Sequence, residues 1–359
     1  MDDFGRRRVG LALGSGSARG LAHIGVIRAL EEAGISADVV AGTSIGAVVG
    51  AVHAAGNVRE LEEAYLAFDW KKVAYFLDVV FPRSGIIDGR KVSEFIREHI
   101  STRRIEDLGL SFRAVATDLF TGEEVVLRSG DVIDAVRASF SMPGMFTPMR
   151  YGRRVLVDGG LVNPVPVSVA RDMGAEVVIA VDLNHDIVAG KGPVASAGGA
   201  AGGSGGSGTD RGVPADATAN SGRAARDSVR STPSNVSSPS SSATNGGPGR
   251  MRLLRAAMAR LDERLRREDH RLSAEAKQTA PDPEPLPGIV DVVLTSLNIM
   301  ETQITRIRLD MDPPDLLIRP ALGSVRFLDF HRAGEIIDAG YRAAKEALAE
   351  APAGWWRGR

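Results

Sequence analysis

The sequence contains no cysteine among its 359 residues. This excludes disulfide bonds, a thiol nucleophile and thiolate metal ligands. The six histidines are scattered, and no two of them have the H-x-x-x-H spacing of a helical metal site. The sequence therefore predicts no metal site.

The chain also lacks a strong net charge and a membrane-spanning apolar run. Lys and Arg number 44 and Asp and Glu number 45, so the formal charge of -1 gives no argument for binding nucleic acid. Residues 39–56 carry no charged side chain, but glycines and hydroxyl residues interrupt them, which favours a buried strand, a turn and a packed helix. The arginines at 6–8 precede an apolar run too short for a signal peptide. These features predict a cytoplasmic protein.

Residues 7–185 alternate between short apolar runs and stretches with helical periodicity. Buried strands are predicted at 9–13, 38–41, 112–117, 124–127, 155–157 and 177–181, and helices at 19–33 and 45–55. Continuous apolar strands separated by helices are typical of an α/β protein with a mostly parallel sheet covered by helices on both faces.

The composition changes near Ile187. Residues 189–250 consist mainly of Gly, Ser, Ala, Pro, Thr and Asn, and are predicted to be disordered because they have too few apolar side chains to offset the entropy of ordering. Residues 251–272 place an apolar stripe among arginines, which predicts a basic amphipathic helix.

Apolar periodicity returns after residue 287. An apolar run at 289–297 is followed by predicted strands at 304–309 and 316–318 and by a closing helix at 331–348. We therefore predict one domain at 7–348, interrupted by an insertion at 187–287 and followed by a tail at 349–359.

The strongest local motif is Gly42-Thr43-Ser44-Ile45-Gly46, which matches G-x-S-x-G. It follows a predicted strand and opens a predicted helix, the context in which this motif carries a nucleophilic serine. The turn presents the serine Oγ outward, and the helix N-terminus supplies free N–H groups. A glycine-rich turn with an ordinary serine N-cap is the alternative. The context favours Ser44 as a nucleophile.

A second loop between a predicted strand and a helix reads Gly14-Ser15-Gly16-Ser17-Ala18-Arg19-Gly20. Backbone N–H groups of such a loop can form an oxyanion hole, in which each donor typically contributes about 3 kcal/mol of transition-state stabilisation. A dinucleotide site is the alternative, but the third glycine comes one residue late, and Asp38 begins the second strand where an acidic residue should end it.

A nucleophilic serine needs a base. Asp158-Gly159-Gly160 follows a predicted strand, and so do Asp118 and Asp182; spacing alone does not choose among the three, and each also fits an ordinary turn aspartate. A carboxylate has a free pKa of about 4, so the base would have to be buried in an apolar cleft. A Ser–Asp–His triad that uses His331 is a further alternative, although His331 stands at the entry of the closing helix.

Taken in order, the glycine loop, the Ser44 motif and Asp158-Gly159-Gly160 resemble the patatin-like phospholipase family, especially its bacterial members related to neuropathy target esterase. Further matching stretches are 138–144 with Phe146 and Pro148, 163–166 and, more faintly, 316–320 and 330–333. No single motif is decisive, but the ordered set is specific.

The resemblance implies a three-layer patatin-like fold and a Ser44–Asp158 dyad without histidine. It implies oxyanion donors in the glycine loop, with the amides of Gly16 and Ser17 foremost, and hydrolysis of an acyl ester of a lipid without a metal or organic cofactor. Two features depart from the family pattern. Many members have an unbroken glycine run where this chain has Ser15 and Ser17, and the resemblance gives no interpretation of the insertion at 187–287.

The acyl donor stays open among phospholipid, lysophospholipid, acylglycerol and thioester. Two other classes of function are a nucleotide-binding protein that uses the glycine loop and a catalytically silent relative that acts as a regulatory partner. Peripheral contact with the inner membrane face is predicted through 251–272, and Trp355 and Trp356 would suit the same boundary. A solvated helix or a lid over the cleft is the alternative for 251–272.

Overall fold

The computed structural model describes residues 7–76, 87–186, 286 and 288–357. The chain divides into two units, and the unit made of Met1–Ser196 and Pro287–Arg359 contains every described residue except Leu286. The predicted disordered stretch at 189–250 and the predicted basic helix at 251–272 lie outside the described residues. Every element of secondary structure named below belongs to the first unit.

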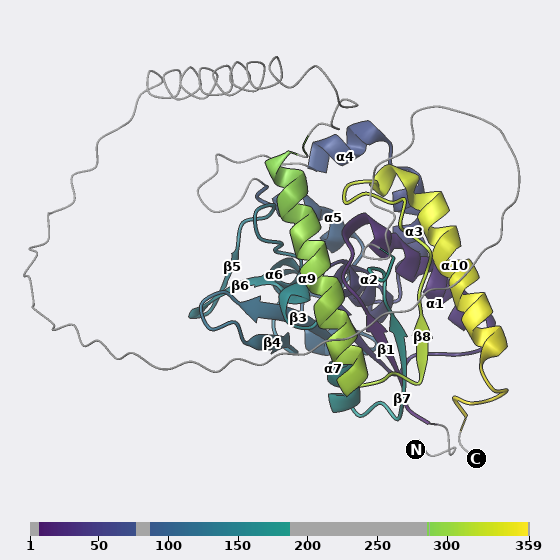
Figure 1. The fold of residues 1–359 in the computed structure, drawn as a ribbon. Helices are drawn as coiled ribbons and strands as arrows, with labels where there is room; N and C mark the ends of the chain where they lie inside the picture. The colour runs from purple at the N-terminus through teal and green to yellow at the C-terminus, as the bar shows by residue number, and fades with distance from the viewer. Residues whose placement is uncertain (1–6, 77–86, 187–285, 287, 358–359) are drawn as a thin grey trace, which may run out of the picture. The chain divides into compact units, whose positions relative to one another are not determined.

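Within the described residues, eight strands form one mixed sheet (Figure 1). The strands are β1 (Val9–Leu13), β2 (Val39–Thr43), β3 (Ser111–Asp118), β4 (Glu124–Leu127), β5 (Met149–Tyr151), β6 (Arg154–Asp158), β7 (Val177–Val181) and β8 (Leu316–Ile318). Their order is β5-β6-β3-β2-β1-β7-β8, and β4 also pairs with β3. Five neighbouring strands are parallel: β8, β7, β1, β2 and β3. Three pairs are antiparallel: β3 with β4, β3 with β6, and β5 with β6. The prediction of a mostly parallel sheet is confirmed.

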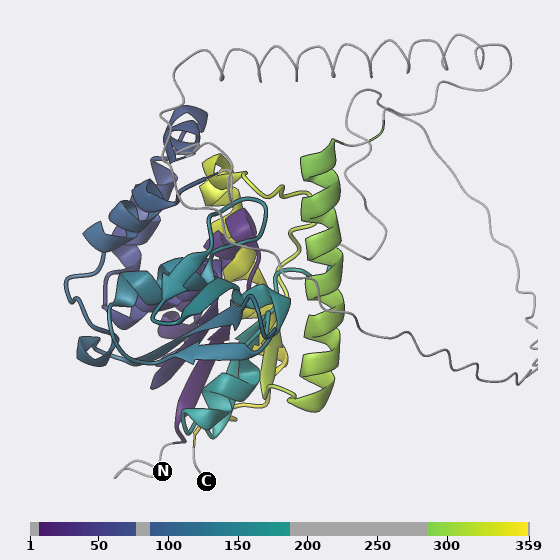
Figure 2. The ribbon, with the colours of Figure 1, turned by 90° about the vertical axis from the view of Figure 1, so that its left-hand side faces the viewer.

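Helices cover both faces of this sheet (Figures 1 and 2). The α-helices are α1 (Ala22–Glu32), α2 (Ile45–Ala54), α3 (Val58–Leu66), α4 (Trp70–Phe76), α5 (Arg90–Glu98), α6 (Val132–Ser139), α7 (Val167–Asp172), α9 (Ile289–Met311) and α10 (Ala333–Glu350). Short 3-10 turns are η1 (Ser17–Leu21), η2 (Ile105–Asp107), η3 (Gly159–Leu161) and η4 (Phe330–Arg332). The predicted helix at 19–33 therefore begins as the 3-10 turn η1 and continues as α1.

Strand side chains alternate between the two faces, as the period of two requires. Leu11 and Leu13 of β1 belong to the larger core, which packs against α1, α2, α6 and α10. Ala12 of β1 belongs to a second core on the opposite face, together with Val169 of α7 and Leu309 of α9. Helices, sheet and helices thus form three layers, which confirms the predicted fold class.

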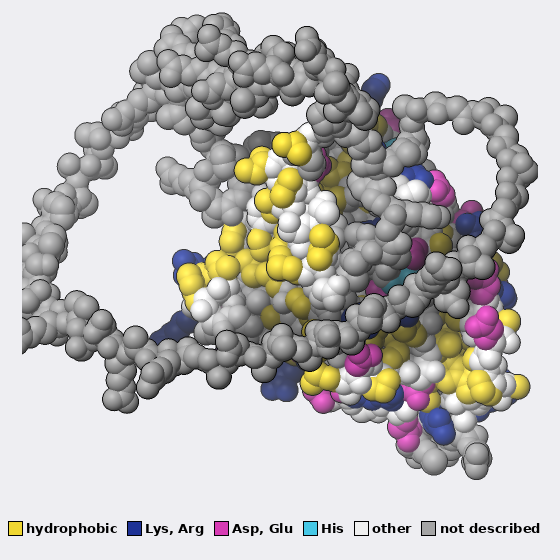
Figure 3. All heavy atoms as spheres, viewed as in Figure 1, with side chains coloured by type: hydrophobic (Ala, Val, Ile, Leu, Met, Phe, Trp, Pro, Cys, Tyr) yellow, Lys and Arg dark blue, Asp and Glu magenta, His cyan; other side chains and the backbone are white. Residues whose placement is uncertain are grey.

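The predicted strand at 304–309 is wrong, because these residues form the last turns of α9. Four residues of α9 at i+4 spacing are buried: Leu297, Glu301, Thr305 and Leu309. This period of a helical face extends over the whole element and outweighs the β-branched residues of one short window. Ile299 and Ile307 are among the exposed apolar side chains of α9. Figure 3 shows apolar side chains on the face of the molecule on which α9 lies.

The closing helix predicted at 331–348 corresponds to η4 and α10. Beyond α10, Trp355 and Trp356 are half-buried and pack against the larger core, so the two rings are engaged with the protein. No helix among the described residues is both long enough and apolar enough to cross a membrane.

Candidate active site

Ser44 stands between β2 and α2 in a strained backbone conformation. Its φ of 57° and ψ of -122° lie outside the regions that L-residues usually adopt, which costs on the order of 1–3 kcal/mol. The two glycines of the motif allow this turn to pack closely. A Cβ at Gly42 would lie 2.4 Å from the Gly46 carbonyl oxygen, and one at Gly46 would lie 2.1 Å from the Leu13 oxygen. The motif therefore forms the sharp strand–helix turn that its sequence predicts.

The register of β3 brings Asp158 to this turn. Val115 of β3 pairs with Thr43, the residue before Ser44, and Ala116 pairs with Asp158. The last residues of β2 and β6 thus lie against consecutive residues of β3, although 114 positions separate Ser44 from Asp158 in the chain.

A short hydrogen bond joins the two side chains. The Ser44 hydroxyl donates to Asp158 Oδ2 at 2.6 Å, and the Gly160 N–H donates to Asp158 Oδ1 at 2.8 Å. Ser44 is 7% exposed and Asp158 is 1% exposed. The carboxylate is therefore fixed by one bond to each oxygen, with one oxygen directed at the serine hydroxyl.

The environment of Asp158 makes it an unusually strong base for a carboxylate. Burial, together with the nearby charge of Glu301, raises its pKa to about 8, although the hydrogen bonds from Ser44 and Gly160 oppose the shift. Burial favours the neutral form because the charged form loses its hydration. A carboxylate with a pKa in this range can accept a proton near neutral pH.

The other two candidate carboxylates serve local structure. Asp118 accepts hydrogen bonds from the N–H groups of Phe120 and Thr121. Asp182 accepts the N–H of Asn184, and its other oxygen receives the Arg319 Nε at 3.1 Å. Of the three carboxylates that spacing left open, Asp158 is the one that the structure bonds to Ser44.

The candidate histidines have other surroundings. His331 is exposed and packs edge-on against Trp70, with 5.3 Å between ring centroids. His23 is fully buried, and its Nε2 lies 2.8 Å from the Gly14 carbonyl oxygen. Burial lowers the pKa of His23 to about 4, so the neutral ring donates to Gly14 and supports the glycine loop. Among the described residues, no cluster of three or more histidine and acidic side chains could hold a metal ion.

The glycine loop keeps two amides free. The N–H groups of Gly14, Ser15, Ala18 and Arg19 donate to the carbonyl oxygens of Val181, Pro164, Phe327 and Gly16, in that order. No hydrogen bond to an acceptor in the described part of the chain occupies the N–H groups of Gly16 and Ser17. These are the two amides that the resemblance to patatin-like phospholipases implied as oxyanion donors.

The two serines that replace glycines anchor this loop. The Ser15 hydroxyl donates to Glu301 Oε2 at 2.8 Å, and the Ser17 hydroxyl donates to the Phe327 carbonyl oxygen at 2.7 Å. Ser17 has a φ of 50°, in the left-handed region that a glycine would enter freely. The hydrogen bonds compensate for the glycines that the loop lacks. Asp38, the residue weighed for a dinucleotide site, accepts the N–H of Val9 at the opposite end of β1.

Ser139, at the end of α6, connects the Ser44 turn to β3 through two hydrogen bonds. Its hydroxyl donates to the Val115 carbonyl oxygen at 2.5 Å and accepts the Ser44 N–H at 2.9 Å. The sequence singled out its neighbourhood only as a matching stretch, without a role for this side chain.

We expect Ser139→Ala to lower kcat/KM about tenfold and the free energy of unfolding by about 1–3 kcal/mol, because two buried backbone groups would lose their partner. Ester hydrolysis and urea unfolding measure the two effects. Ser111→Ala, at the exposed start of β3, is the matched control. An unchanged kcat/KM in Ser139→Ala would show that the Ser44 turn does not depend on this support.

Sequence reasoning missed Glu301 and Asn184. Both are buried, and Asn184 Nδ2 donates to Glu301 Oε2 at 3.1 Å. One signal was available, because Glu301 stands at i+4 spacing between Leu297 and Thr305 on the buried face of α9. A carboxylate at such a position requires a partner inside the protein.

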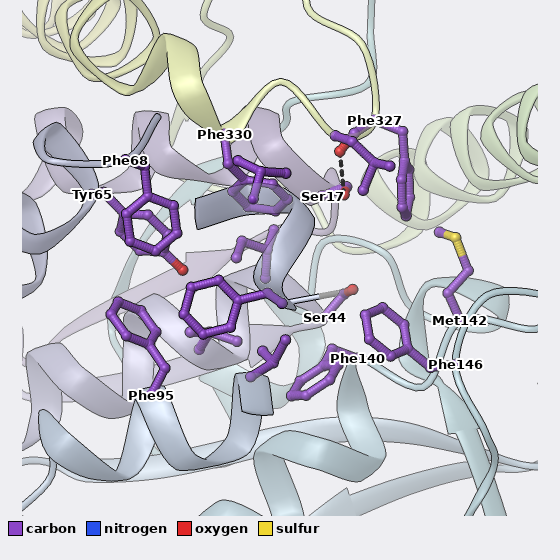
Figure 4. Close-up of a pocket in the computed structure, with 16 residues that line it drawn as sticks. Ser17, Ser44, Tyr65, Phe68, Phe95, Phe140, Met142, Phe146, Phe327 and Phe330 are labelled. Atoms are coloured by element: carbon purple, nitrogen blue, oxygen red, sulfur yellow. Dashed lines mark hydrogen bonds between the residues drawn. The ribbon is translucent and has the colours of Figure 1, made fainter. Parts of the chain in front are cut away.

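A pocket opens beside Ser44. Figure 4 shows the rings of Tyr65, Phe68 and Phe95 at one end and Phe140 near Ser44. The described residues that line the pocket include no Lys, Arg, His, Asp or Glu. The hydroxyl of Ser44 therefore faces a space that suits an apolar group.

Comparisons with known proteins identify relatives of this chain. The family model described as patatin-like phospholipase matches residues 11–171. An uncharacterized NTE family protein of Mycobacterium tuberculosis is 33% identical over 351 residues, which cover 95% of this chain and 91% of that protein. Patatin-like phospholipase domain-containing protein 6 of Mus musculus is 35% identical over 181 residues, covering 49% of this chain and 13% of that protein. The crystal structure of VipD from Legionella pneumophila covers 49% of this chain and 50% of that chain at 15% identity, with a TM-score of 0.31, too low to support an argument.

Proposed function

Because this chain belongs to the NTE family of patatin-like phospholipases, a family of lipid hydrolases, we propose that it cleaves acyl esters with Ser44 as nucleophile and Asp158 as base. The observation that carries this proposal is the 2.6 Å hydrogen bond from the Ser44 hydroxyl to the buried Asp158 carboxylate at the mouth of an apolar pocket. A serine nucleophile and a base within hydrogen-bond reach are the arrangement that acyl transfer requires.

In the first step, Ser44 Oγ attacks the ester carbonyl carbon while its proton passes to Asp158 Oδ2. The free amides of Gly16 and Ser17 stabilise the oxyanion of the tetrahedral intermediate. Asp158 then protonates the leaving alcohol as the carbon–oxygen bond breaks, and the acyl group remains on Ser44. In the second step, Asp158 takes a proton from water, which attacks the carbonyl carbon of the acyl-serine. Asp158 then returns this proton to Ser44 Oγ as the bond between Ser44 Oγ and the acyl carbon breaks, and the fatty acid leaves.

The pocket supports a proposal for where the acyl chain binds. Its lining is largely aromatic and aliphatic, so it favours a hydrocarbon chain over a charged head group. The acyl chain lies in the pocket, and the alcohol or head group leaves toward solvent. Lysophospholipid, phospholipid, acylglycerol and thioester substrates all satisfy this arrangement, so a panel with a fixed acyl chain and varied leaving groups is the assay for substrate choice.

The pH dependence of turnover follows from the pKa of Asp158. The base must be ionised to accept the serine proton, and its pKa is raised to about 8. We expect kcat/KM to rise about tenfold per pH unit below that value and to level off above it. Rates measured between about pH 5 and 10 test this expectation, and a profile that is flat from about pH 6 to 9 contradicts it.

Labelling with a fluorophosphonate followed by peptide mapping tests the proposal itself. Modification of wild-type protein at Ser44 supports the hydrolase. Absence of labelling in folded protein would instead favour the catalytically silent regulatory protein. Thermal stabilisation by NAD or NADP would favour the nucleotide-binding alternative.

A further inference from the structure

Glu301 is a buried carboxylate to which the proposed mechanism assigns no step. It lies on α9 and is 2% exposed. We propose that Glu301 is a positioning residue of this site, which ties the glycine loop to the turn after β6 and places a second negative charge beside Asp158. This inference rests on the proposed function, whose residues it orients.

One oxygen of Glu301 holds the glycine loop. Oε2 accepts the Ser15 hydroxyl at 2.8 Å and the Asn184 side-chain amide at 3.1 Å. The same Asn184 amide lies 3.2 Å from Ser15 Oγ, to which it donates. These three side chains connect α9, the loop after β1 and the segment after β7. Because Ser15 directly precedes Gly16, the contact fixes the loop next to its free amides.

The other oxygen of Glu301 packs on the turn that orients Asp158. A Cβ at Gly160 would lie 2.5 Å from Glu301 Oε1, so Glu301 would have to shift if this residue carried a side chain. The N–H of Gly160 donates to Asp158 Oδ1 at 2.8 Å. Glu301 therefore touches both the loop of the proposed oxyanion donors and the residue that holds the proposed base.

Charged side chains surround Glu301 and its neighbours. Burial raises the pKa of Glu301, whereas the Ser15 hydroxyl, the Arg19 guanidinium and the Asn184 amide oppose that rise. Asp158 faces it across Gly160, and Asp182, the next carboxylate, is paired with Arg319. A negative charge on Glu301 disfavours ionisation of Asp158.

Four single variants of the full chain separate charge from contact. Glu301→Gln removes the charge but keeps an oxygen that accepts from Ser15. Ser15→Ala removes the contact but keeps the charge. Glu301→Asp keeps the charge with a shorter reach. Asp310→Asn, an exposed carboxylate on the same helix, is the matched control.

The first measurement is the rate of fluorophosphonate labelling of Ser44 between about pH 5 and 10. For Glu301→Gln we expect the acidic limb to move down by roughly one pH unit, because loss of a neighbouring negative charge lowers the pKa of Asp158. For Ser15→Ala and Glu301→Asp we expect the plateau rate of labelling to fall about 3–10-fold, because one orienting hydrogen bond is lost or weakened. The acidic limb of their pH–rate profiles should stay at the wild-type position. Asp310→Asn should follow the wild type. If the acidic limb of the Glu301→Gln profile coincides with that of wild type, the proposed role of the charge is overturned. If the plateau rate of Ser15→Ala equals that of wild type, the proposed role of the contact is overturned.

A second measurement does not depend on catalysis. Thermal unfolding of Glu301→Gln, Asp158→Asn and the double variant forms a cycle that reports the interaction of the two carboxylates. We expect non-additive shifts in Tm near pH 9, above the pKa of Asp158, and a smaller interaction near pH 5. Additive shifts at both pH values overturn the inference. If wild-type Ser44 is never labelled while the cycle shows coupling, the proposed function fails and the pairing of Glu301 with Asp158 stands.

Discussion

Replacing Ser44 by alanine should abolish ester hydrolysis and fluorophosphonate labelling, with kcat reduced about 10⁴-fold or more. The proposed reaction has no other nucleophile, because the hydroxyl that donates to Asp158 is the atom that attacks the carbonyl carbon. Turnover of a chromogenic acyl ester and mass spectrometry of the labelled peptide measure the effect.

Ser44→Gly is the companion variant that separates lost chemistry from lost folding. Ser44 has a φ of 57° and a ψ of -122°, a conformation strained for alanine as well as for serine. Glycine enters such regions with less strain, although it loses more backbone entropy on folding. We expect Ser44→Gly to be inactive, yet about 1–2 kcal/mol more stable than Ser44→Ala. Hydrolysis by either variant at a rate near that of wild type would remove Ser44 from the mechanism.

Replacing Asp158 by asparagine should lower kcat about 10⁴-fold while it stabilises the fold at neutral and alkaline pH. The amide keeps an oxygen toward the Ser44 hydroxyl but cannot accept its proton. The gain in stability arises because the folded protein holds Asp158 with a pKa near 8, whereas the unfolded chain ionises it near its ordinary value.

The sign of this pH effect follows from proton binding. Between about pH 4 and 8 the folded state retains a proton that the unfolded state has released. The contribution of Asp158 to the free energy of unfolding is therefore fully present below about pH 4 and is lost as the pH rises to 8. Asp158→Asn carries no group that loses stability in this way. The difference in free energy of unfolding between this variant and wild type should therefore grow between about pH 4 and 8, to at most about 5 kcal/mol. Urea unfolding at several pH values measures it.

Asp118→Asn is the matched control for this variant. Asp118 is also a buried carboxylate after a β-strand, but it accepts the N–H groups of Phe120 and Thr121 and makes no contact with Ser44. We expect Asp118→Asn to retain activity within about twofold, since a turn aspartate replaced by asparagine keeps an accepting oxygen. If Asp118→Asn were the inactive variant and Asp158→Asn the active one, the assignment of the base would be reversed.

The features that depend on neighbouring residues in the chain could be predicted from the sequence. The six strands expected within residues 7–185 are present, because a continuous apolar run between turn residues is a local signal. The turn at Ser44 is equally local, since five consecutive residues contain both the serine and the glycines that let it pack. The resemblance to patatin-like phospholipases also depended on ordered local motifs, and the family is confirmed.

The sequence by itself thus determined the three-layer fold and the position of Ser44, whereas the tertiary structure decided which side chains surround it. Asp158, Asp118 and Asp182 are equivalent by spacing, and the pairing of Asp158 with Ala116 on β3 distinguishes them. Glu301 enters the site because α9 packs its buried face on Gly160. Strand register and helix packing over such separations depend on the free energy of the whole core, which no short window of sequence contains.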